Sequence, residues 1–484
     1  MVVFSFCLFL FLFIGIGLLS ALSAKGNKAD YLLAGSSVKP WLVALSAVAT
    51  NNSGYMFIGM IGFTYTTGIS SVWVMIGWIF GDLMASLYIH KKLRDVTEQQ
   101  HVLSFGGILA RWHGTEFRKL RFLCGIITVV FLGTYAAAQF KAGSKALHVL
   151  FGWDYSTGAI IGAVMVFLYC MAGGIRASIW TDAAQSFVMI VAMVTLFVFG
   201  VDRVGGFSSF TQQLDAVSTT YLNLAPQDMA VPGVTGILLF IVGWIFAGFG
   251  VVGQPHIMIR FMTMDDSKNI NKVRLYYYSW FTAFYAVTIG VALVARLLIP
   301  AGDNFDTELA LPMLANELLP SFLVGLVLAG LFAATMSTAD SQILSCSSAI
   351  TRDILPKEKT TYFMTKFATV FVTVVGLVIA LYGPESVFAL VLISWSLLAA
   401  AFGPILLIYA LGVRIKEPVA IAMLLVGVAV TIVWRQLGWG EFMYEIAPGM
   451  TSGILVFVIA KLTGLNQVDA EYIKATTRVQ VHPE

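Results

Sequence analysis

Three short segments of the chain place oxygen-bearing side chains and glycines inside stretches that are otherwise apolar. The first is Ala49-Thr50-Asn51-Asn52-Ser53-Gly54-Tyr55, in the middle of the apolar stretch 40–64. Unpaired polar groups are unfavourable in hydrocarbon, and irregular backbone at that depth is tolerated only where it lines a protein cavity. The segment therefore predicts a broken helix. The alternative is that these small polar residues only join neighbouring helices.

The second segment combines glycines with a proline in the apolar stretch 234–258. Glycine is conformationally free and proline cannot continue a helix, so we expect a second unwound point before Pro255. Counted in apolar stretches, the two breaks are five spans apart. Two interrupted helices in corresponding positions of two halves indicate an inverted-repeat transporter with its site near the membrane midplane. The glycines concerned are Gly243, Gly248, Gly250 and Gly253.

The third segment is a stripe of hydroxyl groups in the apolar stretch 320–349. At 100° per residue, five positions of this stretch lie within about 40° of one line along a helix. A hard cation stripped of water needs several oxygen ligands at once, and hydroxyls, a carboxylate and the free carbonyls of an unwound helix supply them. The stripe comprises Ala334, Thr338, Ser341, Ser345 and Ser348, and Ser337 borders it.

The elements that position these segments are predicted to be membrane-spanning helices. The 484 residues are 58% hydrophobic and 11% charged, and the mean hydropathy is +0.86. This composition excludes a water-soluble globular protein of ordinary makeup. Apolar windows of about 20 residues predict thirteen spans. Their ranges are 3–24, 40–64, 68–90, 120–150, 156–174, 180–201, 234–258, 275–300, 320–349, 362–382, 386–412, 417–435 and 447–464.

We predict an all-α integral membrane protein with a single transmembrane domain over residues 1–464. No stretch between the spans is long enough for a separate soluble domain. Within the domain, a first helix at 3–24 is followed by a first repeat at 40–201, a second repeat at 234–412 and two helices at 417–464, and residues 465–484 form a cytoplasmic tail.

Charge sets the predicted orientation. Residues 1–23 contain no Lys or Arg, which disfavours a signal peptide, and the first charges, Lys25 and Lys28, follow the first span. The positive-inside rule therefore places the N-terminus outside and the C-terminus in the cytoplasm. Basic residues, Arg260 among them, concentrate in the loops that this orientation puts inside, whereas the loop from Asp303 to Glu317 is purely acidic.

The sequence gives little support to an enzyme. HExxH, Walker and Ser-His-Asp patterns are absent. The four cysteines, Cys7, Cys124, Cys170 and Cys346, lie in apolar spans without CxxC spacing, so we expect neither a disulfide nor a cysteine metal site. The basic residues lie at helix ends, where membrane orientation alone would put them, so no nucleic-acid partner is expected.

The chain resembles the sodium:solute symporter family in three motifs. They are Gly173 to Asp182 (GGIRASIWTD), Gly253 to His256 (GQPH) and Met336 to Ser341 (MSTADS). The resemblance covers nearly the full length, including Trp434 to Trp439 and Tyr444 to Gly449. Within the family, the bacterial sodium/proline symporters are the most similar branch.

The resemblance implies a LeuT-type fold of 5+5 inverted repeats, in which the second to sixth spans are repeated by the seventh to eleventh. It also implies that sodium is the coupled ion. Several of the positions already selected for their oxygens coincide with the family's main sodium site. Carried over onto this sequence, its ligands are the carbonyls of Ala49, Asn52 and Ala334 and the hydroxyls of Ser337 and Thr338.

Some members of the family bind a second sodium through an acid and hydroxyl groups. Here that site would consist of Asp182, Ser337, Asp340 and Ser341. Asp340 is a carboxylate where such members can carry a hydroxyl. The alternative is that the two nearby carboxylates share a proton.

Residues of the two breaks, together with one lysine, are the candidate substrate ligands. Lys141 lies in the outer half of its span, where it would meet an anionic group of the substrate, and snorkelling to the surface is the alternative. Asp82 is expected to have a structural role, by a salt bridge to another helix, or to line the inward exit. The candidate ligands are Asn51, Ser53, Tyr55, Lys141, Trp244, Gly250, Val251 and Gln254.

The substrate itself is less well defined than the family. The proline branch has an acid in place of Asn51, a Trp in place of Tyr55 and a Tyr in place of Val251, and Phe249 to Gly253 is more similar to the pantothenate branch. Half-helix N-termini favour a carboxylate group. We therefore expect a carboxylate-bearing substrate, with proline or a related amino acid first and pantothenate or another organic anion second.

The expected function is sodium-coupled import by alternating access across the plasma (inner) membrane. The partners are then a small solute, sodium and the lipid bilayer, and no obligate protein partner is evident. A transporter-like membrane sensor that binds a ligand and signals to a partner is the alternative from another class. A channel is disfavoured because the sequence shows neither rings of charge nor a carbonyl-filter motif.

Overall fold

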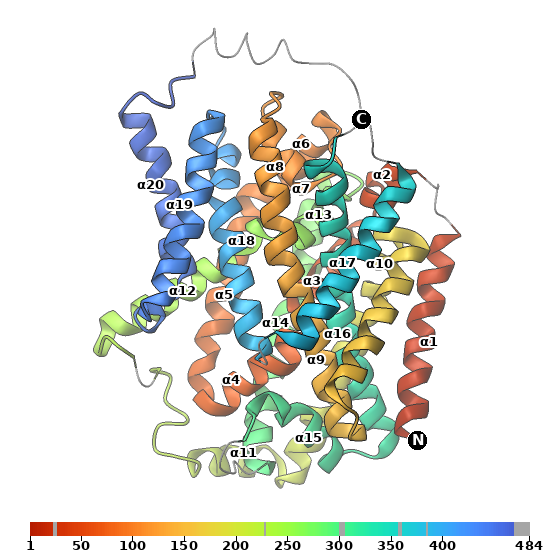
Figure 1. The fold of residues 1–484 in the computed structure, drawn as a ribbon. Helices are drawn as coiled ribbons and strands as arrows, with labels where there is room; N and C mark the ends of the chain where they lie inside the picture. The colour runs from red at the N-terminus through yellow and green to blue at the C-terminus, as the bar shows by residue number, and fades with distance from the viewer. Residues whose placement is uncertain (23–26, 227–228, 300–304, 357–360, 384–385, 469–484) are drawn as a thin grey trace.

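The computed structural model describes residues 1–22, 27–226, 229–299, 305–356, 361–383 and 386–468. It is a bundle of long helices that run in roughly the same direction (Figure 1). The N-terminal end of α1 lies at the end of the bundle that also holds α11 and α15, whereas α2, α6 and α7 lie at the opposite end. The predicted tail is described only as far as residue 468, and residues 469–484 lie outside the described residues.

The helices of the bundle follow the predicted spans. In the first half they are α1 (Val2–Ala21), α3 (Pro40–Gly54), α4 (Met60–Thr67), α5 (Val72–Ala85), α6 (Lys91–Gln100), α8 (Arg118–Ile127), α9 (Gly133–Phe151) and α10 (Tyr155–Arg203). In the second half they are α12 (Gly233–Phe249), α13 (Pro255–Met262), α14 (Ile270–Leu298), α16 (Ser321–Ser348), α17 (Tyr362–Tyr382), α18 (Val387–Ala410), α19 (Glu417–Gln436) and α20 (Ile446–Leu462). Short helices at the two ends are α2 (Lys28–Leu33), α7 (Phe105–Arg111), α11 (Gly206–Asp215) and α15 (Ala310–Leu318).

In the described part of the chain, ten helical stretches are long and apolar enough to cross a membrane, and two shorter apolar helices accompany them. The stretch Pro40–Gln100 holds two of the predicted spans, and the shorter helices Tyr155–Leu168 and Ile446–Leu462 hold two more. The prediction of an all-α membrane protein is therefore confirmed.

The first predicted break lies between α3 and α4. Ser53 has φ 51° and ψ −178°, a conformation that is uncommon for a residue with a side chain. The backbone there bonds to α9: Gly54 N–H donates to Gln139 Oε1 at 2.9 Å, and Tyr135 Oη lies 3.4 Å from Ser53 Oγ. The helix is thus interrupted where protein groups replace its lost hydrogen bonds, as backbone at membrane depth requires.

The second predicted break lies between α12 and α13. Residues Gly250–Gly253 form a short 3₁₀ turn, Gln254 is extended (φ −98°, ψ 99°), and Pro255 begins α13. A Cβ on Gly253 would lie 2.5 Å from Ala399 Cα, so this close approach to α18 requires glycine. Both predicted breaks are confirmed.

Helix α10 contains two predicted spans separated by a kink at Gly174. This residue has φ 58° and ψ −143°, and a Cβ on it would lie 2.5 Å from the carbonyl oxygen of Tyr31. Any residue with a side chain is excluded by both its backbone conformation and this contact. The kink turns the chain so that the part after Gly174 packs against α16.

Helix α16 lies at the centre of the bundle. Apart from its first turn it is buried along its length, and it packs against α1, α3, α9, α10 and α17. A helix that is polar on one stripe and buried on all sides must place its hydroxyls against other protein groups. Ser337 and Thr338 meet α3, Ser341 meets α3 and α13, and Ser348 donates to the Leu103 carbonyl.

Candidate functional site

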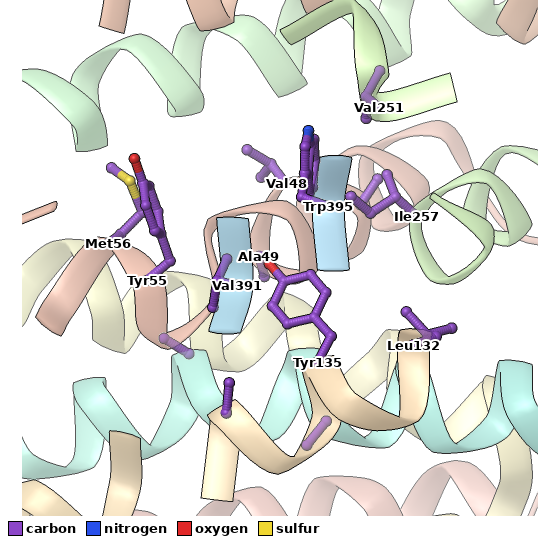
Figure 2. Packing of buried hydrophobic residues seen from close by; sticks show 14 of the residues in the cluster. Val48, Ala49, Tyr55, Met56, Leu132, Tyr135, Val251, Ile257, Val391 and Trp395 are labelled. Atoms are coloured by element: carbon purple, nitrogen blue, oxygen red, sulfur yellow. The ribbon is translucent and has the colours of Figure 1, made fainter. Parts of the chain in front are cut away.

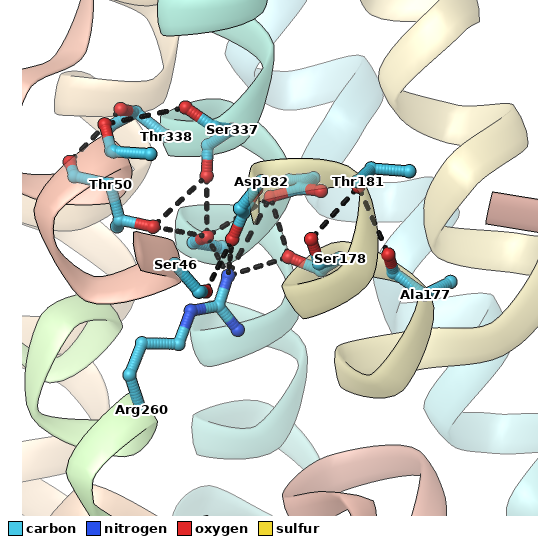
Figure 3. Close-up of polar contacts among 12 residues, drawn as sticks. Ser46, Thr50, Ala177, Ser178, Thr181, Asp182, Arg260, Ser337 and Thr338 are labelled. Carbon is cyan, nitrogen blue, oxygen red and sulfur yellow. Dashed lines mark hydrogen bonds and ion pairs between the residues drawn. The ribbon is translucent and has the colours of Figure 1, made fainter. Parts of the chain in front are cut away.

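The hydroxyls of α16 meet the carbonyls at the end of α3. Ser337 Oγ lies 3.4 Å from the Ala49 carbonyl oxygen and 3.1 Å from that of Ala334. Thr338 Oγ1 donates to the carbonyl oxygens of Thr50 at 3.0 Å and Ala334 at 3.1 Å. All of these residues are buried, and Figure 3 shows Thr50, Ser337 and Thr338 facing one another across the two helices.

This group of oxygens has the chemistry of a site for a hard monovalent cation. Its atoms are backbone carbonyl and hydroxyl oxygens, and hard cations prefer oxygen ligands. Four of the five predicted sodium ligands, Ala49, Ala334, Ser337 and Thr338, are brought together here, and we call these four residues the sodium-ligand group after that prediction. The fifth differs: the carbonyl of Asn52 accepts from the Tyr55 N–H. The carbonyl that meets Thr338 belongs to Thr50, which sequence reasoning did not select.

The predicted second-ion residues surround a buried guanidinium. Arg260 of α13 is 0% exposed, and its Nη2 lies 3.2 Å from Asp182 Oδ2 and 3.9 Å from Asp340 Oδ1. The same nitrogen donates to Ser178 Oγ at 2.5 Å and to Ser341 Oγ. In Figure 3 the Arg260 side chain extends from α13 into the space between α10 and α16.

Serine hydroxyls complete this cluster. Ser178 Oγ and Ser341 Oγ each donate to Asp340 Oδ1 at 3.0 Å, and Ser46 Oγ donates to Asp182 Oδ2 at 2.6 Å. Thr50 Oγ1 lies 3.3 Å from Ser341 Oγ, which links the cluster to the sodium-ligand group. We call Ser46, Ser178, Asp182, Arg260, Asp340 and Ser341 the arginine cluster.

Placing Arg260 among the basic residues of a cytoplasmic loop was wrong. The residue lies in α13, which begins directly after the second break and is buried along its length, so its charge is buried. A buried charge requires an opposite charge and hydrogen bonds, and the arginine cluster supplies both. Counting charges near the end of a span cannot distinguish a loop cation from a buried one.

Most predicted substrate residues lie around an aromatic group between the two breaks. The ring of Tyr55 lies 5.6 Å from that of Trp78, which in turn lies 4.9 Å from Trp395 and 6.0 Å from Trp244. In the view of Figure 2, Trp395 lies between Tyr55 and Val251. Trp78 and Trp395 are members of this group that sequence reasoning missed, because aromatic residues are common in apolar spans.

The glycine-rich turn lies beside this aromatic group. Trp395 Nε1 donates to the Ala247 carbonyl at 2.9 Å, and Gln254 Nε2 donates to the Trp395 carbonyl at 3.0 Å. Val251 is buried, and a Cβ on Gly250 would lie 3.3 Å from Trp395 Nε1. The structure therefore brings Ser53, Tyr55, Trp244, Gly250, Val251 and Gln254 to one region between the breaks.

Two of the predicted substrate residues, Lys141 and Asn51, have side-chain partners outside the aromatic group. The Nζ of Lys141 donates to the Gly383 carbonyl at 2.9 Å, and Lys141 lines a second cavity of about 300 Å³ whose lining also includes Lys145 and Asp306. Asn51 faces α5 and α14, and its Nδ2 donates to Asp82 Oδ2 at 3.0 Å. Asp82 was expected to form a salt bridge or to line the inward exit; among the described residues its partners are neutral, so the salt bridge is not formed.

A cavity of about 560 Å³ leads toward the aromatic group from the end of the bundle that holds α15. Phe388, at the start of α18, lies between this cavity and Tyr55, on which its ring stacks at 5.5 Å. The cavity is lined by Gly59, Gly62, Phe63, Thr66, Thr67, Lys145, Asp306, Thr307, Glu308, Ser386 and Phe388. We call it the vestibule.

Glu308 joins three elements at the wall of the vestibule. Lys145 Nζ lies 2.7 Å from Glu308 Oε2 and 2.8 Å from Asp306 Oδ2. Glu308 also accepts from the backbone N–H groups of Val387 at 3.2 Å and Phe388 at 2.9 Å. A carboxylate at the start of α18 is stabilised by the helix dipole, so Glu308 holds Phe388 in place over Tyr55.

Comparison with known proteins shows that the chain is similar to one family of transporters over most of its length. The model of the Sodium:solute symporter family matches residues 31–427. The High-affinity proline transporter PutP of Bacillus subtilis is 31% identical over 454 residues, which are 92% of this chain and 94% of the relative. The Sodium/proline symporter of Salmonella typhimurium is 31% identical over 475 residues, which are 95% of this chain and 92% of the relative.

Solved structures share the fold. A sodium-coupled sialic acid symporter in a substrate-bound outward-open state superposes with a TM-score of 0.80 at 18% identity, over 96% of this chain and 99% of that one. Mhp1, a nucleobase-cation-symport-1 family transporter, superposes with a TM-score of 0.58 at 13% identity, over 93% and 98% of the chains. The fold is therefore the LeuT-type transporter fold predicted from the sequence.

Proposed function

The chain belongs to the sodium:solute symporter family and is a membrane-embedded, sodium-coupled solute transporter, and we propose that it imports a small carboxylate-bearing solute, with proline or a related amino acid as the first candidate. The main structural support for this proposal is that the Ser337 and Thr338 hydroxyls contact backbone carbonyl oxygens of α3 at the first break. A cation bound there would join the broken helix α3 to the central helix α16. The relatives named for proline support the choice of substrate.

The alternating access that we propose would use two barriers in the molecule. The vestibule reaches Phe388 from one end, whereas the arginine cluster joins α13 to α10 and α16 on the other side of the aromatic group. Transport requires the first barrier to close and the second to open in turn. Sodium must favour one of these states over the other, because an ion without such a preference cannot drive transport. The predicted cytoplasmic-membrane location, with the vestibule facing outside, agrees with this direction of transport.

Uptake by proteoliposomes tests the proposal. Purified protein is reconstituted, a sodium gradient is imposed, and radiolabelled proline uptake is compared with that under an equal potassium gradient. We expect sodium-dependent accumulation of proline that unlabelled amino acids inhibit. Competition by pantothenate, short carboxylates and sugars then ranks the substrate classes. Strong sodium-driven uptake of a neutral sugar, with no response to any carboxylate, would contradict the proposal.

We propose that Asp182, Asp340 and Ser341 serve a second sodium ion or a proton in the part of the cycle in which Arg260 moves away. Asp182→Asn is then expected to lower the sodium-to-substrate ratio while substrate binding persists, because the carboxylate serves an ion other than the main one. Reversal potentials measured in proteoliposomes give the ratio. An unchanged ratio together with reduced expression would show that Asp182 has only a structural role.

Glu308→Gln is expected to lower the uptake rate about tenfold, since it removes charge-assisted bonds worth about 1.5–3 kcal/mol that hold Phe388 and Lys145. The sodium concentration for half-maximal uptake should change little, because Glu308 lies apart from the sodium-ligand group. Initial rates over a range of sodium concentrations provide both quantities.

Asp306→Asn is the matched control for this prediction. Asp306 pairs with the same lysine, but its side chain is 43% exposed, against 10% for Glu308, so water can replace its contacts. An equal loss of rate in both variants would show that the charge of the vestibule matters and that the attachment of α18 does not.

A further inference from the structure

Asp82 of α5 is a fully buried carboxylate whose hydrogen-bond partners are neutral. Its Oδ2 accepts from Asn51 Nδ2 at 3.0 Å and from the Tyr277 hydroxyl at 2.9 Å, and its Oδ1 accepts from the Tyr278 hydroxyl at 2.7 Å. All three partners present donors to the Asp82 oxygens in this structure. Asp82 therefore determines the orientation of the groups around it.

The group that matters most is the side-chain amide of Asn51. Asn51 lies two residues before the distorted Ser53, at the first break, and its Nδ2 also donates to the Tyr277 hydroxyl at 2.6 Å. A reversed amide would turn its carbonyl oxygen toward the Asp82 carboxylate, where two acceptors would repel each other. The amide nitrogen of Asn51 is therefore held toward Asp82, and the amide oxygen is directed away from it.

That oxygen has no partner. Asn51 is 5% exposed, and among the residues that the structure describes its Oδ1 is buried without a hydrogen bond. A buried acceptor without a donor is unfavourable, and such groups in native proteins are usually satisfied by a ligand, an ion or water. The nitrogen branch of Asn51 faces α5 and α14, and the unpaired oxygen lies at the first break, four residues before Tyr55 of the aromatic group.

We propose that Asp82 is a positioning residue for substrate selection: it holds Asn51 so that Oδ1 accepts a hydrogen bond from the protonated amine of an amino-acid substrate. The inference rests on the proposed function and narrows its substrate class to carboxylates that carry a donor nitrogen beside the carboxylate. An organic anion without such a donor leaves Oδ1 unpaired and binds less well.

The test compares proline with tetrahydrofuran-2-carboxylate, in which a ring oxygen replaces the ring nitrogen. In the wild-type protein we expect proline to bind at least about tenfold more tightly, since the analogue has no donor for Oδ1. In Asp82→Asn the amide of residue 51 loses its enforced orientation. The KM of proline should rise about tenfold, and its advantage over the analogue should largely disappear, while the sodium dependence changes by less than about twofold.

A double variant, Asn51→Asp with Asp82→Asn, exchanges the two groups across their hydrogen bond. A carboxylate at position 51 presents only acceptor oxygens, and the amide at position 82 can donate to it, so we expect discrimination against the analogue to return. Tyr278→Phe is the matched control, because it removes one donor to Asp82 without touching Asn51. That control should keep the wild-type preference to within about threefold.

The outcomes distinguish a failure of the proposed function from a failure of the role assigned to Asp82. Wild-type protein that shows no sodium-driven amino-acid uptake would overturn the proposed function and this assignment with it. Wild-type uptake of proline, combined with an unchanged proline-to-analogue ratio in Asp82→Asn, would overturn the assignment alone. If Asp82→Asn is not recovered in folded form, the double variant carries the test, and its failure to discriminate against the analogue would overturn the assignment.

Discussion

Arg260→Gln is expected to reduce sodium-driven uptake by about 100-fold or more. Removal of one partner from a buried ion pair costs about 3–5 kcal/mol, because the charge that remains is buried without compensation. Here the loss leaves Asp182 and Asp340, both buried, without the guanidinium that lies between them. The uptake rate and the thermal unfolding temperature of the detergent-solubilised protein measure the two consequences.

A second substitution distinguishes loss of charge balance from loss of a specific arginine contact. Arg260→Gln combined with Asp340→Asn restores the net charge of the cluster, so we expect the unfolding temperature to recover most of the difference from the wild-type protein. Lys268→Gln is the matched control, since Lys268 is a nearby cation that is exposed. Uptake near the wild-type rate in Arg260→Gln would contradict the role of the arginine cluster. So would a double variant as unstable as the single one.

Thr338→Val and Ser337→Ala are each expected to raise the sodium concentration for half-maximal uptake by about 10–100-fold. Each variant removes one oxygen from a buried group of cation ligands, and a bond between a charged and a polar group contributes about 1.5–3 kcal/mol. Water cannot easily replace the oxygen, because both residues are 0% exposed. The substrate dependence at saturating sodium should change much less.

The matched control is Thr335→Val on the same helix. The hydroxyl of Thr335 donates to the Phe332 carbonyl within α16 and lies outside the sodium-ligand group, so its removal should leave the sodium dependence within about twofold of the wild-type value. Thermal stabilisation of the purified protein by sodium offers an independent measurement, because a ligand that binds the folded state raises its stability. Wild-type sodium dependence in both Thr338→Val and Ser337→Ala would place the site elsewhere.

The sequence by itself determined the class of the molecule and the places where its helices break. Long apolar stretches can only be membrane helices, and polar or glycine-rich residues within them indicate irregular backbone, so the breaks at Ser53 and before Pro255 were predictable. The hydroxyl stripe of α16 was predictable as well, because helical periodicity is a local property. In each case the physical cause lies within a few residues of its effect.

Which atoms meet was decided only by the tertiary structure. Thr338 and Thr50 are 288 positions apart, and the rotation of α3 relative to α16 brings the Thr50 carbonyl, rather than that of Asn52, to the Thr338 hydroxyl. Arg260 looked like a loop cation until the packing of α13 in the bundle placed it against Asp182. Asp82 and Asn51 are paired in the same way, because α3 and α5 both pack against α14. Helix rotations and crossings depend on side-chain packing summed over the whole bundle, and no local pattern in the chain records that sum.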